Sequence, residues 1–165
     1  MTIRRARTSD VPAIRALVAP LAEERILVAK EAVAYYEALQ EFRVAEDADG
    51  RVVGCGALHV MWEDLAEVRT LAADPALRGS GIGHCLLEQL LADAVEIGVR
   101  RVFCLTFEVE FFRRHGFAVM ANQSAVDPEV YSELLRSSDE GVAEFLDLAR
   151  VKPNTLGNTR MIRSF

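Results

Sequence analysis

Three glycines stand at alternate positions, Gly79, Gly81 and Gly83, immediately before a strongly apolar helical pattern. Glycine is a poor helix former, so its use at a helix start needs another reason. A helix start leaves about four N–H groups unpaired and carries roughly half a positive charge. Residues without a Cβ let an anion approach those donors closely, and Arg78 adds a permanent cation. The segment therefore predicts a phosphate-binding site.

Other interpretations of the glycine segment are weaker. A tight turn needs only one glycine, although a turn without a ligand stays open as the structural alternative. The dinucleotide-binding pattern G-x-G-x-x-G requires a glycine where His84 stands. A P-loop requires a Gly-Lys-Ser/Thr sequence, and none follows.

The elements that must position this segment alternate in a defined order. Hydrophobic periodicity predicts the order strand-helix-helix-strand-strand-strand-helix-strand-helix-strand, then two short polar helices and a final strand. The strands are expected at 2–7, 41–47, 51–62, 65–74, 100–108, 117–121 and 159–163. The helix after the glycines runs to about Ile97, with an apolar face made of Ile82, Leu86, Leu87, Leu90, Leu91, Ala94 and Val95. Antiparallel strands followed by a βαβ crossover predict an α+β fold around a mixed sheet.

Length and charge limit the function classes. The 165 residues are expected to form one domain, 1–165, with a substantial core. The formal net charge of −6 argues against nucleic-acid binding, which uses basic surface. No apolar run reaches the roughly 18 residues of a membrane span, and the polar N-terminus lacks a signal-peptide pattern. We therefore expect a cytoplasmic protein without a membrane partner.

The cysteines and histidines do not indicate a metal site. The three cysteines, Cys55, Cys85 and Cys104, form no C-x-x-C motif, and they are expected to be reduced thiols. The three histidines are scattered without a second ligand at metal spacing. We expect no bound metal.

The glycine segment and its context resemble the GCN5-related N-acetyltransferases, the GNAT family. Arg78-x-x-Gly81-x-Gly83 is similar to the family signature R/Q-x-x-G-x-G/A, and "FFRRHGF" resembles the later F-Y-x-x-x-G-F motif. The resemblance implies a mixed, mostly antiparallel sheet of six to seven strands flanked by helices. It also implies acetyl-CoA as co-substrate, bound by Leu71, Ala72, Ala73, Arg78, Gly79, Ser80, Gly81, Ile82, Gly83, His84 and Phe112.

Four segments resemble more closely the acetyltransferase domain of N-acetylglutamate synthases: "LVAPLAEERILV", "GCGAL", "AEVRTLAADPALRGSGIG" and "LTFEVEFFRRHGF". This resemblance implies an amino-acid N-acetyltransferase that acts on the α-amine of L-glutamate or L-glutamine, the first step of arginine biosynthesis. It also implies a short, stand-alone form of the enzyme and a homodimer.

This resemblance and the chemistry of the residues together suggest site residues, and Arg69 falls two residues after Glu67, on the same face of a strand. Glu67 matches an acidic residue of the relatives and is the expected general base in a direct transfer without a covalent enzyme intermediate. Arg69 and Lys30 are candidate ligands of the substrate carboxylates, and Thr106 and Asn158 are weaker polar candidates. Two alternatives stay open. Glu67 could be a carboxylate of its strand that pairs with Arg69 or faces solvent, and Arg69 and Lys30 could be surface charges. Phe112 stands where many members of the family have a tyrosine acid.

Two other functions stay open. The enzyme could acetylate another small amine or a peptide N-terminus, because an acidic surface also suits cationic substrates. A non-catalytic acetyl-CoA sensor would retain the coenzyme site and lack the chemistry of Glu67.

Overall fold

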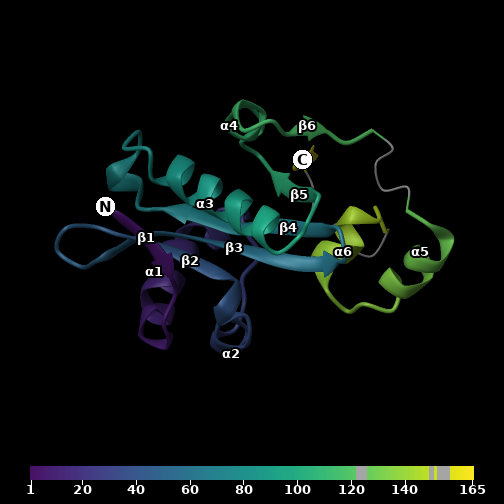
Figure 1. Ribbon diagram of the computed structural model, residues 1–165. Coiled ribbons are helices and arrows are strands. Elements are labelled where there is room, and N and C mark those ends of the chain that lie inside the picture. Colours follow the sequence, from purple (N-terminus) through teal and green to yellow (C-terminus); the bar gives the residue numbers. More distant parts are fainter. Residues whose placement is uncertain (122–125, 149–150, 152–156) are drawn as a thin grey trace. The chain divides into compact units, whose positions relative to one another are not determined.

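Seven strands form one mixed sheet in a computed structural model of the chain, which describes residues 1–121, 126–148, 151 and 157–165. The strands lie in the order β1 (Thr2–Arg5), β2 (Phe42–Glu46), β3 (Val52–Trp62), β4 (Leu65–Ala73), β5 (Arg101–Thr106), β7 (Thr159–Ser164) and β6 (Ala118–Val119) (Figure 1). β4 and β5 pair in parallel. The pairs β1–β2, β2–β3, β5–β7 and β6–β7 are antiparallel. The predicted α+β class with a mixed, mostly antiparallel sheet is confirmed.

The chain divides into two compact units. The first comprises Met1–His59 and Val68–Ile97, and the second comprises Val60–Glu67 and Gly98–Phe165. Strands β3 and β4 therefore each contribute residues to both units. The single domain expected over residues 1–165 stays a prediction.

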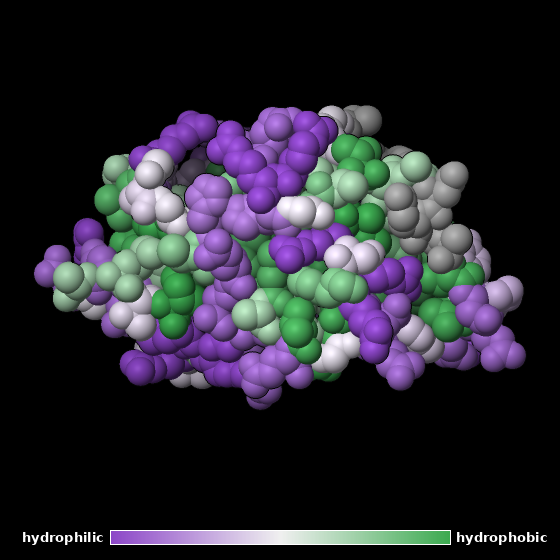
Figure 2. Space-filling view, turned by 45° about the horizontal axis from the view of Figure 1, so that its top comes forward, coloured by the Kyte–Doolittle hydropathy of each residue, from purple (hydrophilic) through white to green (hydrophobic). Residues whose placement is uncertain are grey.

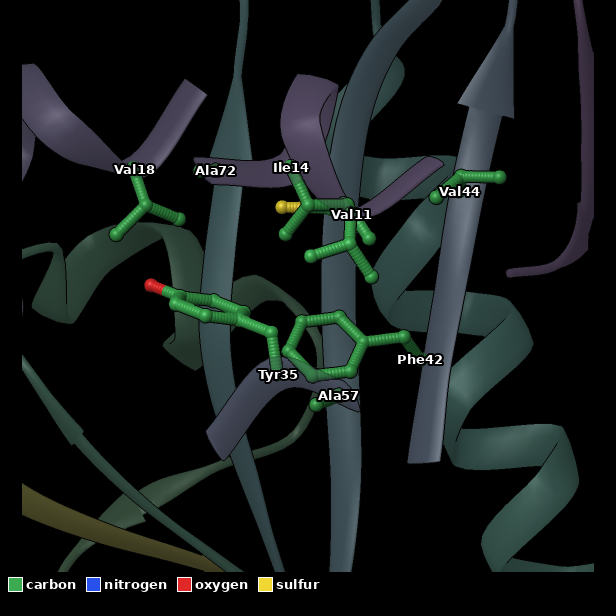
Figure 3. Close-up of a cluster of buried hydrophobic side chains, with 9 residues drawn as sticks. Val11, Ile14, Val18, Tyr35, Phe42, Val44, Ala57 and Ala72 are labelled. Carbon is green, nitrogen blue, oxygen red and sulfur yellow. The ribbon is translucent and has the colours of Figure 1, made fainter. Parts of the chain in front are cut away.

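The first unit is built around an apolar cluster under two short helices. Helices α1 (Val11–Glu23) and α2 (Ala32–Glu37) contribute to it together with strands β2, β3 and β4. The rings of Tyr35 and Phe42 lie 6.0 Å apart at the centre of this cluster (Figure 3). The buried members are Val11, Ile14, Val18, Tyr35, Phe42, Val44, Cys55, Ala57 and Ala72. Ala72 is the residue that β4 contributes to this cluster.

Helix α3 (Ile82–Glu96) is the long helix that follows the glycine segment. Ile82 and Leu86 pack with Ala45 and Val53 in a second cluster of the first unit. The predicted apolar face is buried except at Val95, which is 55% exposed. A helix turns by about 100° per residue, and this rotation carries Val95 past the edge of the buried stripe. Its inclusion in that face was wrong.

Two glycines of β3 allow α3 to lie close to the sheet. A Cβ at Gly54 would lie 2.6 Å from Ile82 Cγ2, and a Cβ at Gly56 would lie 2.9 Å from Leu90 Cδ1. Side chains at either position would overlap the helix, so these glycines serve the close approach of helix and strand.

The second unit is centred on β5. This strand pairs with the start of β4 and with β7, and helices α4 (Val109–Arg114), α5 (Pro128–Leu134) and α6 (Glu140–Phe145) complete the unit. Its core consists of Met61, Leu65, Phe103, Met120, Leu134, Val142, Phe145, Leu146 and Ile162.

Helix α6 differs from the polar helix that its sequence indicated. Residues 141–145 are all buried, and the Phe145 ring packs edge-on against Phe103 at 5.7 Å. The six-residue helix does not form separate solvent-exposed and buried faces. Val142 and Phe145 pack in the core of the second unit and hold the helix there. Glu144, the buried carboxylate of this helix, is carried into the core together with Val142 and Phe145.

No described helix is both long and apolar enough to cross a membrane. On the face drawn in Figure 2, hydrophilic and hydrophobic residues are interspersed. The cytoplasmic location and the homodimer stay predictions.

Candidate active site

The glycine segment leads into α3 through two left-handed residues. Gly79 has φ 85° and Gly81 has φ 84°, and Gly81 is the N-cap of the helix. L-residues with side chains adopt such angles at a cost, so glycine is needed here for the backbone path. A Cβ at either position would meet nothing within 4 Å among the described residues. The space beside this backbone is therefore open to a ligand.

Fewer backbone N–H groups of the segment point to anion binding than the sequence suggested, because two of them donate within the turn. Arg78 N–H donates to Pro75 O at 3.2 Å, and Ser80 N–H donates to Leu77 O at 3.1 Å. These bonds close the turn before the helix. The first helical bond runs from Cys85 N–H to Gly81 O at 3.0 Å. The N–H groups of residues 82–84 precede it and stand at the positive end of the helix.

Strand β4 bends just before the residues expected to align the thioester. Thr70 has φ 57°, a left-handed angle that is unfavourable for a β-branched residue. The Cys55 thiol donates to Thr70 O at 3.6 Å, and Asp74 N–H donates to Val53 O at 2.9 Å. Backbone strain of this kind often marks functional segments. Thr70 thus stands directly before Leu71–Ala73 within β4.

The end of β4 and the start of α3 both lie next to Gly54 of β3 in the first unit. Its Cβ, if present, would lie 3.3 Å from Ala72 O as well as 2.6 Å from Ile82 Cγ2. The end of β4 and the first residue of α3 therefore meet at one glycine. The predicted thioester strand and the predicted pyrophosphate segment lie together in this unit.

The proposed base, Glu67, belongs to the second unit and is buried, with 7% exposure. It pairs with Phe103 of β5 in the parallel register. A Cβ at Gly141 of α6 would overlap Glu67 Oε2 and lie 2.8 Å from Glu67 Cδ. Burial raises the pKa of the Cys104 thiol well above its ordinary value, and the charge of Glu67 raises it further. Glu67 therefore lies between β5 and the start of α6.

Arg69 already has a carboxylate partner within the first unit. Its guanidinium donates to Glu41 Oε2 at 3.3 Å, and the other oxygen of Glu41 lies 2.8 Å from His59 Nδ1. Burial acts to raise the pKa of Glu41, but the hydrogen bonds and charges of His59 and then Arg69 more than offset it and lower that pKa. Any carboxylate that binds Arg69 shares it with Glu41.

The remaining predicted residues are spread over both units. Lys30 is exposed between α1 and α2. Thr106 is buried at the end of β5, where its hydroxyl accepts from Glu108 N–H at 2.9 Å. Asn158 Oδ1 is buried and has no hydrogen-bond partner among the described residues. Phe112 packs edge-on against Phe111 and Phe117, each at 5.2 Å, which suits a core role at least as well as a coenzyme contact.

Some neighbours of the site were missed in the sequence. Glu41, His59 and Gly141 come from segments far from the motifs, and no periodicity connects them with Arg69 or Glu67. The "GCG" pattern of β3 was a usable signal, because glycine within a strand often marks a close backbone approach. Among the described residues, no group of three metal-ligating side chains could hold a metal ion.

Comparison with known proteins gives the class. The sequence pattern of the Acetyltransferase (GNAT) family matches residues 13–117. The chain belongs to this family, and the predictions of a GNAT fold and of an acyltransferase are confirmed.

Particular relatives narrow the class further. An amino-acid acetyltransferase from Mycobacterium tuberculosis is 58% identical over 162 residues, which cover 97% of this chain and 92% of the relative. A crystal structure from Mycobacterium tuberculosis, in complex with CoA and NLQ, has a TM-score of 0.95 at 56% identity and covers 100% of this chain and 99% of its own. N-acetylglutamate synthase from Neisseria gonorrhoeae, complexed with coenzyme A and N-acetyl-glutamate, has a TM-score of 0.78 at 26% identity. The match covers 99% of this chain and 34% of that synthase. The predicted co-substrate, acetyl-CoA, agrees with the CoA in both structures.

Replacing Gly81 by alanine is expected to weaken acetyl-CoA binding by about tenfold or more, because a methyl group would enter the space that an anion needs. The KM for acetyl-CoA should rise while the KM for the amine substrate changes little. Gly98 provides a matched control at the other end of α3, since it has φ 91° and equally open surroundings. Equal effects of Gly81→Ala and Gly98→Ala would contradict the assignment.

Replacing Glu41 by glutamine is expected to reduce the loss of stability in acid. The folded-state pKa of Glu41 lies below its ordinary value of 4.5, so its carboxylate stabilises the fold above that value. This stabilisation is lost as the pH falls through the folded-state pKa. Urea unfolding at about pH 7 and about pH 3 should show a smaller difference for Glu41→Gln than for the wild type. The exposed Glu24→Gln variant should follow the wild type; an unchanged difference in Glu41→Gln refutes the expectation.

Proposed function

We propose that the chain transfers the acetyl group of acetyl-CoA to the α-amine of an amino acid, glutamate or glutamine, at the first step of arginine biosynthesis. The observation that carries the proposal is the content of β4. This strand holds a buried carboxylate, Glu67, four residues before Leu71, and it ends at the turn into the glycine segment. The name and near-complete coverage of the 58% identical relative support an amino acid as acceptor.

The coenzyme would be held mainly by backbone. The open space at Gly79 and Gly81 and the N–H groups of residues 82–84 fit a pyrophosphate, and Arg78 adds a positive charge at the edge. Acetyl-CoA supplies an activated acetyl thioester when bound. A backbone N–H within Leu71–Ala73 would stabilise negative charge on the acetyl oxygen, an effect often worth about 3 kcal/mol.

Glu67 would accept the proton of the attacking amine, directly or through water. An α-ammonium has a pKa near 8, so the neutral nucleophile is available at modest cost near neutral pH. A carboxylate then needs only to bind the proton while the carbon–nitrogen bond forms. Since Phe112 occupies the position of the family tyrosine, solvent would protonate the leaving thiolate.

The substrate carboxylates would bind to Arg69 and Lys30. Arg69 offers a planar guanidinium that is already oriented by Glu41. Lys30 offers an exposed point charge. Thr106 and Asn158 would contribute polar contacts, and the buried Oδ1 of Asn158 is a ready acceptor for an N–H donor.

A panel of twenty amino acids, assayed by release of the CoA thiol, tests this function. Glutamate and glutamine should be the best acceptors, and Arg69→Ala should raise their KM much more than the KM for acetyl-CoA. Peptide N-termini and polyamines belong in the same panel as competing acceptors. A better turnover with any of these would replace the amino-acid substrate, and acetyl-CoA binding without any turnover would favour a sensor.

A further inference from the structure

We propose that Gly141 is a positioning residue for the carboxylate of Glu67, and that α6 thereby supports the reaction from outside the family-matched residues 13–117. The inference rests on the proposed function of Glu67 as the base. It assigns a role in acetyl transfer to the C-terminal part of the chain, which the family motifs do not reach.

The first argument is the space at Gly141. A Cβ there would overlap Glu67 Oε2, lie 2.8 Å from Glu67 Cδ and lie 3.0 Å from Asp139 Oδ1. Atoms in proteins do not approach a Cβ this closely without a shift. Only glycine therefore allows the Glu67 carboxylate to lie in this position against the first turn of α6.

The second argument is that the backbone of α6 is held at both ends. The Asp139 carboxylate accepts from Val142 N–H at 3.1 Å, and Ser137 Oγ accepts from Asp139 N–H at 3.1 Å. At the other end, Arg160 donates to the carbonyl oxygens of Glu144 and Phe145 at 3.5 and 3.4 Å. These contacts, with the Phe145–Phe103 ring pair, give the helix little freedom to retreat.

The third argument concerns what would move. The atoms nearest to a methyl group at Gly141 are the end of the Glu67 side chain, whereas the helix is held at both ends. Alanine should therefore displace the carboxylate rather than unfold the unit.

The variant Gly141→Ala tests this inference. We expect kcat to fall by about 100-fold, since a small misplacement of a catalytic group has effects of this size. Acetyl-CoA affinity and the unfolding temperature should stay near the wild-type values. The control is Glu140→Ala, which changes the preceding, exposed residue of the same helix. Glu140→Ala should keep kcat near that of the wild type.

Rescue by a shorter carboxylate separates positioning from a general structural role. Glu67→Asp leaves room for the methyl group, so Gly141→Ala should cost much less in a Glu67→Asp background than in the wild type. The crystal structure of Gly141→Ala should show the Glu67 carboxylate displaced and α6 in place. An undisplaced carboxylate, an unfolded variant or an equal cost in both backgrounds would each overturn the inference.

The turnover of Glu67→Gln distinguishes this inference from the proposed function. Low turnover of Glu67→Gln together with normal turnover of Gly141→Ala overturns the role of Gly141 and leaves the base in place. Normal turnover of Glu67→Gln removes the base, and the positioning role is then overturned with it. Low turnover of both variants, with rescue in the Glu67→Asp background, supports both.

Discussion

The close approach of α3 to the sheet is the constraint on which the candidate coenzyme site depends. Gly54 lets Ile82 at the helix start and the carbonyl of Ala72 on β4 share one small space. The positive end of the helix and the strand proposed to align the thioester are thereby fixed in the same unit. A side chain at Gly54 would push the start of α3 away from β4, even with the glycine segment unchanged. The anion donors are thus set by packing on β3 as much as by the turn that precedes the helix.

The candidate polar groups of each unit are held by specific neighbours. Glu41 links Arg69 to His59 in the first unit, and the start of α6 receives Glu67 in the second. Each of these groups is partly or wholly buried, where the position of a charge changes its energy more than it would in water. With a net charge of −6 in the chain, the local cations at Arg69 and Arg78 gain in importance for the proposed anionic substrate and coenzyme.

Much of the fold could be predicted from the sequence, because the strands and α3 have clear periodicity and the turns have glycine or proline. The glycine segment predicted an anion site, and acetyl-CoA was inferred from the resemblance of this segment and of "FFRRHGF" to the GNAT family. The burial of α6 could not be predicted, because it depends on tertiary packing, whereas the exposure of Val95 follows from the helical rotation of about 100° per residue. Gly141 gave no signal for the same reason: its contact with Glu67 joins residues 74 positions apart in the chain. The substrate contacts of Arg69, Lys30, Thr106 and Asn158 stay predictions.

The pH dependence of turnover in Glu67→Gln tests the central claim most directly, namely that a buried carboxylate in β4 serves as the base. The wild type should lose turnover at low pH as the carboxylate is protonated. In Glu67→Gln, turnover should fall by about 100-fold or more. The remaining turnover should rise with pH toward the amine pKa near 8, since solvent must then take the proton. Wild-type turnover with an unchanged pH profile in Glu67→Gln would contradict the account.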